Sequence, residues 1–468
     1  MIRNYENAIK CLNQLQTNFS TIQEIRHQWT KGKPPREPDL IPQMIEWIRR
    51  IGYSPNDFDS MNPIHVTGTK GKGSVCAFLQ SILLQYVGDV GLYTSPHLKS
   101  VTERIRINGQ PLSEEKFAKY FFDIYERLEN TSSDLDKFPR HVPGAKPMYF
   151  RYLTLMSFHA FMQENIKHAI YEVGIGGEYD STNIFVSPRA CAVSSLGIDH
   201  TAVLGNTIGE IAWNKAGIFK RGVPAYTIDD QPAEAVQVLR ERAIEKQVSK
   251  FEIVPIHGDI AGKTLGLRGK FQEKNATLAC YLAGEALGIE ISHHKSLPEK
   301  FISGLETATW PGRCQVMQTS PTTKWFMDGA HTTESLEAAT EWFASVVDKS
   351  QPISLVFNQQ KRDNVADLLT NFYGNMKSHG IKVAKAYFTT NQSFESGFLA
   401  DMVSHNVSAE EVNLLTIQNQ LANVWSKLDP DTEIHVCSSL EQVVAKADGQ
   451  IFATGSLLML GGLLAVID

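Results

Sequence analysis

The 468-residue sequence predicts an α/β protein with mostly parallel sheets. Two observations predict this class. Short apolar runs alternate with longer amphipathic stretches along the chain, and several apolar runs are followed directly by a turn and a helical pattern. The apolar runs of strand type are NPIHVTG, GDVGLYTS, HAIYEVG, CAVSSLG, KWFMDG, PISLVFN, EIHVCSS and QIFATGS.

The stretch SEEKFAKYFFDIYERLEN, residues 113–130, is a predicted helix. Ser113 can cap its start, and two glutamates follow at the positive end of the helix dipole. Five side chains recur at helical spacing and form one apolar stripe: Phe117, Tyr120, Phe121, Ile124 and Leu128. The next segment, 131–147, is polar and contains prolines, so we expect a long loop.

Composition excludes some classes of function. Hydrophobic residues make up 42% of the chain, charged residues 21%, and the formal net charge is −6. A general nucleic-acid binder is not expected, because no basic excess exists to neutralise phosphates along a strand. The balance is compatible with a small anionic substrate held in a local positive pocket.

The cysteines and the amino-terminal stretch indicate the compartment. The six cysteines are scattered without a CxxC pair, which is typical of reduced thiols and not of disulfides or a zinc site. The amino-terminal stretch has no continuous apolar segment and carries Glu6, so neither a secretory signal nor a transit peptide is expected. We expect a cytoplasmic protein, and a mitochondrial form is the alternative if a second start site adds a leader.

The final segment, IFATGSLLMLGGLLAVID, raises the question of a membrane helix. Its apolar run is shorter than the roughly 20 residues that a span needs, and Gly461 and Gly462 interrupt it. We therefore expect a closing strand, a turn and a buried helix, with no membrane span.

The stretch HVTGTKGKGSVCAFLQSILL, residues 65–84, predicts a phosphate-binding loop between a strand and a helix. A glycine-rich turn at a helix amino terminus aims backbone N–H groups and the positive dipole end at one point. Lys72 would add a charge toward the terminal phosphates, and Ser74 an oxygen ligand for Mg²⁺. The match to GxxxxGK[ST] is not strict, because Val66 holds the first position and Gly73 separates Lys72 from Ser74. The structural alternative is a tight turn with a solvated lysine.

A carboxylate is a candidate for holding the metal, because phosphoryl transfer depends mainly on positioning and charge neutralisation. Glu172 stands late in the apolar run HAIYEVG, directly before a glycine-rich turn, where an oxygen ligand could meet Mg²⁺. The string GIGGEY lacks the third glycine of GxGxxG, so a dinucleotide-binding fingerprint is not favoured. The alternative for Glu172 is a solvated carboxylate at a strand end.

Further polar residues follow other predicted strands. His200 follows CAVSSLG, and Lys215 lies on a helical stretch just beyond it; taken alone, each is more often structural or solvated. Asp328 and His331 follow the strand KWFMDG, with Thr332 or Thr333 as a helix cap. The residues alone thus predict an α/β protein that uses ATP and has two candidate sites, one at the phosphate loop and one at Asp328 and His331.

A fresh strand–turn–helix series begins after TWPGRCQ, residues 309–315. We therefore expect two domains. Residues 1–311 would form a P-loop ATPase-like domain on a mostly parallel sheet, and residues 312–468 a smaller Rossmann-like α/β domain.

Eight sequence motifs together resemble those of the folylpolyglutamate synthases, most closely the eukaryotic type, and occur in the same order. They are GTKGKGS, TSPHL, ERIRING, EVGIGGEYDSTN, SLGIDHTAVLG, AWNKAGIFK, TWPGR and DGAHTTES. The resemblance runs from LNQLQTN, near residue 12, to TGSLLMLGG and thus covers essentially the whole chain. The P-loop and DGAH are shared with the wider Mur-ligase superfamily and with dihydrofolate synthases.

The resemblance implies where ATP binds. Gly71, Lys72, Gly73 and Ser74 match the phosphate loop of the family. The remaining positions that match nucleotide contacts are Gln272, Asn275, Arg313, Asp328 and His331. Because these residues lie on both sides of the predicted boundary, the resemblance implies an ATP site at the domain interface that closes by domain movement.

The resemblance also implies metal ligands and catalytic residues. Ser95, Glu172 and His200 would hold Mg²⁺, with Ser74 assisting. Lys215 matches a lysine that is carbamylated in relatives; a carbamate offers an anionic oxygen to Mg²⁺, whereas an ammonium cannot bind it. The expected catalytic residues are Lys72, Lys215 and His200. A monovalent cation such as K⁺ is a further expected cofactor.

The implied reaction adds L-glutamate to the γ-carboxylate of reduced folate polyglutamates. A carboxylate is a poor acyl donor, so the γ-phosphoryl group of ATP would first form an acyl phosphate. The amine of glutamate then attacks, and ADP and phosphate are the other products. The expected partners are therefore small molecules, and we expect a monomer with its glutamate site near His331.

Two other functions are compatible with the sequence. A dihydrofolate synthase would add the first glutamate to dihydropteroate, and comparing the two acceptors separates the two ligases. A P-loop nucleotide-binding regulatory protein without ligase activity would hydrolyse ATP independently of folate and glutamate.

Overall fold

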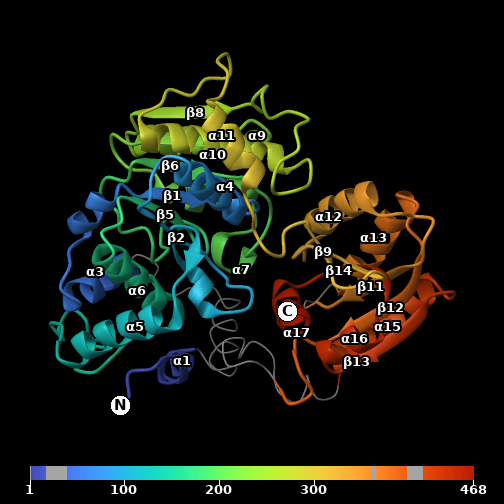
Figure 1. The fold of residues 1–468 in the computed structure, drawn as a ribbon. Coiled ribbons are helices and arrows are strands. Elements are labelled where there is room, and N and C mark those ends of the chain that lie inside the picture. Colours follow the sequence, from blue (N-terminus) through green and yellow to red (C-terminus); the bar gives the residue numbers. More distant parts are fainter. Residues whose placement is uncertain (1, 17–39, 360–364, 398–414) are drawn as a thin grey trace. The chain divides into compact units, whose positions relative to one another are not determined.

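The computed structural model describes residues 2–16, 40–359, 365–397 and 415–468. The chain forms two compact units (Figure 1). Unit 1 comprises Met1–Pro96, Thr102–Gly266 and Gln272–Thr309; unit 2 comprises His97–Val101, Leu267–Phe271 and Trp310–Asp468. The sequence-based division, 1–311 and 312–468, stays a prediction and does not anticipate the two short segments that join unit 2.

Unit 1 is built on one eight-stranded sheet in the order β4-β3-β2-β5-β1-β6-β7-β8. The six strands from β2 to β8 in this order are parallel, and β3 and β4 pair antiparallel at one edge. The strands are β1 (Ile64–Thr67), β2 (Val90–Tyr93), β3 (Ile105–Ile107), β4 (Gln110–Pro111), β5 (His168–Glu172), β6 (Ala190–Val193), β7 (Pro224–Ile228) and β8 (Lys250–Val254). The predicted α/β class with mostly parallel sheets is confirmed.

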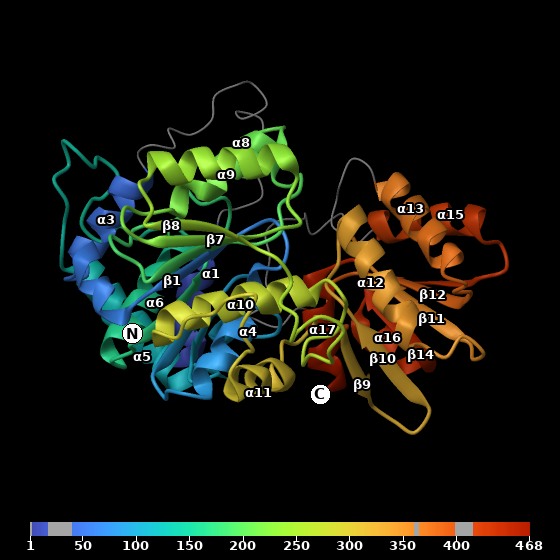
Figure 2. The same ribbon diagram turned by 90° about the horizontal axis from the view of Figure 1, so that it is seen from above.

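Helices cover the sheet of unit 1. In Figure 2, α9 lies on one side of β7 and β8, and α10 lies on the other side next to α4. The helices are α1 (Tyr5–Gln14), α3 (Leu40–Arg50), α4 (Lys72–Leu84), α5 (Glu114–Glu129), α6 (Tyr149–Gln163), α7 (Thr201–Leu204), α8 (Ile208–Lys215), α9 (Ala233–Glu245), α10 (Gln272–Leu287) and α11 (Glu299–Thr307), with short 3₁₀ turns η2 (Pro55–Met61), η3 (Val101–Arg104) and η4 (Ala216–Ile218).

The predicted helix at 113–130 is confirmed as α5. The Ser113 hydroxyl accepts a hydrogen bond from the Lys116 N–H at 3.2 Å, and the whole apolar stripe is buried. The predicted loop at 131–147 contains no helix or strand. Its start is held by the buried Arg50 guanidinium, which donates to the carbonyl oxygens of Leu128 at 2.6 Å and Thr131 at 2.7 Å.

Unit 2 contains a six-stranded sheet in the order β13-β12-β11-β14-β10-β9, in which only β9 is antiparallel. Alternate residues of its strands supply two cores, because successive side chains point to opposite faces. One core packs against α12, α13 and α15, and the other against α16 and α17. Helices on both faces of a mostly parallel sheet confirm the Rossmann-like expectation.

The elements of unit 2 have the following bounds. The strands are β9 (Gln315–Gln318), β10 (Thr323–Met327), β11 (Ile353–Phe357), β12 (Val383–Thr389), β13 (Glu433–Cys437) and β14 (Gly449–Thr454), and the helices are α12 (Thr333–Val346), α13 (Val365–Ser378), α15 (Thr416–Leu428), α16 (Leu440–Lys446) and α17 (Leu457–Ile467). The final apolar segment is thus a strand, a turn and a buried helix, as predicted. Within the ranges that the structure describes, no helix could span a membrane.

Three buried histidines, His65, His141 and His159, should make the stability of the fold depend on pH. Burial lowers the pKa of His65 to about 3, and those of His141 and His159 to about 4. These rings are neutral in the folded protein but take up a proton below pH ~6.5 in the unfolded chain. Their contribution to stability is therefore complete above pH ~6.5 and is lost as the pH falls toward ~4.

We expect the free energy of unfolding to fall between pH 6.5 and 4, by up to about 1.4 kcal/mol per pH unit for each histidine. Urea unfolding at several pH values measures this slope. The variant His141→Gln should flatten it, and a stability that is constant over this range would contradict the prediction.

Candidate active site

The glycine turn between β1 and α4 forms the floor of the candidate site. Gly71 caps α4 with φ +85°, a conformation that favours glycine. A Cβ on Gly68 would lie 1.9 Å from the Ser194 hydroxyl oxygen, and one on Gly71 2.3 Å from Asn275 Oδ1. The first N–H groups of α4 have no partner within the helix, so they and the helix dipole suit a phosphate.

The glycine at position 71 gives a prediction. Gly71→Ala forces a strained backbone and pushes against Asn275, so we expect ATP affinity to fall at least about tenfold. Isothermal titration with an ATP analogue measures the change. Gly88→Ala is the matched control, because a Cβ there meets nothing within 4 Å. Equal affinities of the two variants would contradict the role given to the turn.

Two predicted lysines converge beneath this turn. Lys72 Nζ and Lys215 Nζ both donate hydrogen bonds to the carbonyl oxygen of Gly68, at 3.0 Å and 2.9 Å. Lys215 is buried, and burial together with the charge of Lys72 holds its pKa well below the ordinary value. Two lysine side chains thus meet at the turn, and the charge of Lys72 can neutralise part of the charge of a polyphosphate.

His200 is the next predicted site residue at the phosphate loop. It is the amino-terminal cap of α7 with φ +51°. The surrounding protein lowers its pKa, Asp199 opposes this, and the charges of Lys72 and Lys215 lower it further. The His200 backbone N–H donates to Asp199 Oδ1 at 2.8 Å, and the other oxygen of Asp199 pairs with Lys70 of the glycine turn at 3.3 Å, which connects His200 to the phosphate loop.

Glu172 supplies the negative charge expected for a metal. It ends β5 and is buried, and its Oε2 accepts a hydrogen bond from the Ser95 backbone N–H at 3.0 Å. Ser95 follows the neighbouring strand β2, so two strand ends bring these residues together. β5 packs against α4, and the pKa of the buried Cys76 thiol on α4 is raised by burial and, second, by the Glu172 charge.

The start of α10 completes the site in unit 1. Gln272 Nε2 donates to the Ser74 hydroxyl at 3.2 Å, and Gln272 Oε1 accepts from Asn275 Nδ2 at 2.8 Å. Asn275 Oδ1 is buried without a hydrogen-bond partner and lies against Gly71. A buried acceptor without a partner at this turn is available to a bound ligand or water.

Oxygen donors at this place fit a hard divalent cation. The buried carboxylate of Glu172 and the hydroxyls of Ser74 and Ser95 are the ligand types that Mg²⁺ prefers, with His200 nearby. Among the described residues no three His, Cys, Asp or Glu side chains are grouped to hold a metal. The set thus suits an ion that also takes phosphate oxygens and water, as Mg²⁺ does.

In unit 2, the predicted site residues Arg313, Asp328 and His331 form a second cluster at the carboxyl end of β10. Asp328 is buried and accepts hydrogen bonds from the N–H groups of Cys314 at 2.8 Å and Ala330 at 3.0 Å. Burial raises its pKa, and the Arg313 cation opposes this shift. A Cβ on Gly329 would lie 2.4 Å from Arg313 Nη1, which explains the glycine of DGAH. His331 Nδ1 lies 2.8 Å from the Gly329 carbonyl oxygen.

Sequence reasoning missed a buried polar network at the same edge of unit 2. Asn358, after β11, accepts from Gln418 Nε2 at 3.0 Å and donates to Asn391 Oδ1 at 2.8 Å. Ser456, which caps α17, also donates to Asn391 Oδ1, at 3.2 Å. The available signal was the run of polar residues directly after each strand. Because ligands gather at the carboxyl ends of parallel strands, this network widens the candidate site of unit 2.

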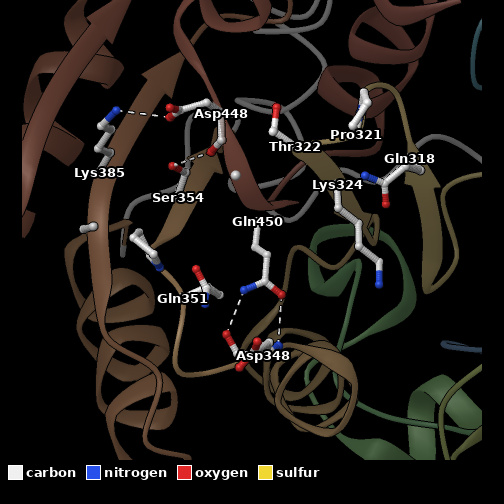
Figure 3. A pocket seen from close by; sticks show the side chains of 13 residues that line it. Gln318, Pro321, Thr322, Lys324, Asp348, Gln351, Ser354, Lys385, Asp448 and Gln450 are labelled. Atoms are coloured by element: carbon white, nitrogen blue, oxygen red, sulfur yellow. Dashed lines mark hydrogen bonds and ion pairs between the residues drawn. The ribbon is translucent and has the colours of Figure 1, made fainter.

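A cavity of about 500 Å³ lies at the opposite, amino-terminal edge of this sheet (Figure 3). Lys385 Nζ pairs with Asp448 at 3.1 Å, and Gln450 bonds to the backbone of Asp348. Its position is away from Asp328 and His331, and polar groups of its lining bond to one another. We therefore place the candidate site of unit 2 at the carboxyl edge.

The fold and these two clusters define a P-loop α/β protein with a second, Rossmann-like unit. No protein-family model matches the chain. The folylpolyglutamate synthase of Saccharomyces cerevisiae (strain ATCC 204508 / S288c) is 48% identical in an alignment 486 positions long, which covers 100% of this chain and 87% of that protein. The chain belongs to the folylpolyglutamate synthase family, which confirms the resemblance of the motifs.

Solved structures agree with this assignment in fold. Mycobacterium tuberculosis folylpolyglutamate synthase complexed with ADP matches with a TM-score of 0.72 at 20% identity, over 99% of both chains. A complex of FPGS with AMPPCP and folate matches with a TM-score of 0.66 at 21% identity, over 98% of both chains. The roles of the individual site residues stay predictions.

Proposed function

We propose that this chain is an ATP-dependent ligase that adds L-glutamate to the γ-carboxylate of folate polyglutamates. The observation that carries the proposal is the convergence of Lys72 and Lys215 on the Gly68 carbonyl, beneath a glycine turn at the start of α4. Membership of the folylpolyglutamate synthase family supplies the class of substrate. The products are ADP, phosphate and a folate lengthened by one glutamate.

The residues of unit 1 perform the first step by positioning and charge. The γ-carboxylate oxygen attacks the γ-phosphorus of ATP, ADP leaves, and an acyl phosphate remains. Negative charge gathers on the transferred group, where Lys72 and the amino terminus of α4 stabilise it. Glu172, Ser95, Ser74 and His200 would hold Mg²⁺, which would supply further neutralisation of the phosphate charge.

The second step is attack by the amine of L-glutamate on the acyl carbon. The tetrahedral intermediate collapses, and phosphate leaves with one oxygen of the original carboxylate. In unit 2, His331 and the network around Asn358 offer hydrogen-bonding groups for an amino acid at the carboxyl edge of the sheet. We assign the glutamate site to this edge.

Several finer points belong to the same proposal. Mg²⁺ is the proposed metal and K⁺ an accessory cation. The chain acts as a monomer in the cytoplasm, with a mitochondrial form as the alternative. A carbamate on Lys215 would turn a buried amine into an anionic metal ligand. The depressed pKa of Lys215 supports this, because only a neutral amine adds to CO₂.

Incorporation of radiolabelled L-glutamate with Mg-ATP tests the proposal, with tetrahydrofolate and dihydropteroate offered in parallel. Incorporation into tetrahydrofolate, in step with ADP and phosphate, is the expected result. Incorporation only into dihydropteroate would identify a dihydrofolate synthase. ATP hydrolysis that is independent of folate and glutamate would instead identify a nucleotide-binding protein without ligase activity.

A further inference from the structure

The loop that follows β5 is hydrogen-bonded to the last turn of α8, at the residue that precedes Lys215. The Gly177 N–H donates to Asn214 Oδ1 at 3.0 Å, and the Glu178 N–H donates to the Asn214 carbonyl oxygen at 2.8 Å. A Cβ on Gly177 would lie 2.5 Å from the Lys215 carbonyl oxygen. Only a glycine lets the loop backbone approach the helix this closely.

The side chain of Glu178 forms ion pairs with residues of α9 and its carboxyl-terminal cap. Its carboxylate forms an ion pair with the Arg242 guanidinium, and Lys246 Nζ lies 3.2 Å from its other oxygen. Arg242 is 3% exposed, and its guanidinium carbon lies 4.3 Å from the ring centroid of Trp213 on α8. A single arginine therefore links the loop, α8 and α9.

We propose that the Glu178–Arg242 pair positions Lys215 for the ligase reaction. Trp213, Asn214 and Lys215 are consecutive: the first two are held by Arg242 and the loop, and the third reaches Gly68. α8 has only eight residues, too few for a stable helix by itself, so tertiary contacts must fix its end. Glu178 and Arg242 are positioning residues and touch no substrate.

This inference rests on the proposed function, because the position of Lys215 matters only if Lys215 acts at the phosphates. The test compares Glu178→Gln with Glu245→Gln in the full chain. Glu245 pairs with the same arginine at 2.7 Å, but it is largely exposed and lies on α9 together with Arg242. It is therefore a matched control for the loss of one carboxylate beside Arg242.

For Glu178→Gln we expect kcat for glutamate addition to fall about tenfold, because small misplacements of a catalytic group are costly. The KM values for folate and glutamate should change less than about twofold, since neither substrate is contacted. Amide hydrogen exchange of residues 212–219 should become faster, whereas Glu245→Gln should leave both kcat and this exchange unchanged.

Wild-type kcat and unchanged exchange at 212–219 in Glu178→Gln would overturn the inference, as would equal losses in both variants. If Glu178→Gln does not fold, Trp213→Leu takes its place with the same readouts, because Trp213 is 40% exposed and its loss should be tolerated. An inactive wild-type chain would instead refute the proposed function, and the exchange measurement would still decide whether the pair holds α8.

Discussion

Replacing Lys72 by alanine is expected to abolish glutamate addition. Lys72 lies at the first position of α4 and donates to Gly68, so its charge stands where the terminal phosphates of ATP would meet the helix amino terminus. Removing one group that stabilises transition-state charge typically costs about 10²–10³ in kcat. We expect a loss at the upper end of this range or beyond, because the lost group carries a full charge.

The control for this variant is Lys10→Ala on α1. Lys10 is an exposed lysine whose visible partner is the ion pair with Glu6. Its loss should leave kcat unchanged. The measurement is initial-rate incorporation of labelled glutamate at saturating ATP, with melting temperatures to confirm folding. Lys72→Ala that keeps more than a tenth of the wild-type kcat would remove Lys72 from the mechanism.

Replacing Lys215 by methionine should separate catalysis from folding. Methionine has a similar shape without an amine, and Lys215 is a buried amine whose pKa is depressed by burial and by the charge of Lys72. Replacing a buried ionisable group by an apolar side chain of similar volume should leave the melting temperature within a few degrees. We expect kcat to fall at least about 100-fold, because a group that meets Lys72 at the Gly68 carbonyl oxygen is lost.

The proposed carbamate on Lys215 can be tested separately by ¹³C NMR. With ¹³C-bicarbonate the wild-type chain should show a carbamate carbon signal in the NMR spectrum, and Lys215→Met should lack it. A melting temperature that collapses together with activity would instead make Lys215 a structural residue.

Sequence patterns predicted those helices and strands whose local sequence alone indicates the secondary structure. α5 was predictable because a serine cap, acidic first-turn residues and a helical apolar stripe all agree. The buried strands β1 and β5 appear as short apolar runs, since both faces of a parallel sheet are covered. By contrast, β3 has only three residues, and β4 and β9 are short strands at the edges of the two sheets, so none of them forms an apolar run long enough to differ from a loop.

In the candidate site, only the residues that follow a strand or belong to a motif could be predicted from the sequence. Glu172, Asp328 and the phosphate loop follow strands, where α/β proteins place ligands. The convergence of Lys72 and Lys215 on one carbonyl joins residues 143 positions apart in the chain, and nothing local encodes it. The Glu178–Arg242 pair and the network around Asn358 likewise depend on tertiary packing, which a single sequence does not specify.

The most direct test of the central claim follows one oxygen atom. A folate substrate labelled with ¹⁸O in its γ-carboxylate should pass one labelled oxygen to inorganic phosphate for each glutamate added, because the carboxylate attacks the γ-phosphorus and phosphate later leaves with that oxygen. Mass spectrometry of the released phosphate measures the transfer. Phosphate free of ¹⁸O during active glutamate addition would contradict the acyl-phosphate route and the roles assigned here to Lys72 and Lys215.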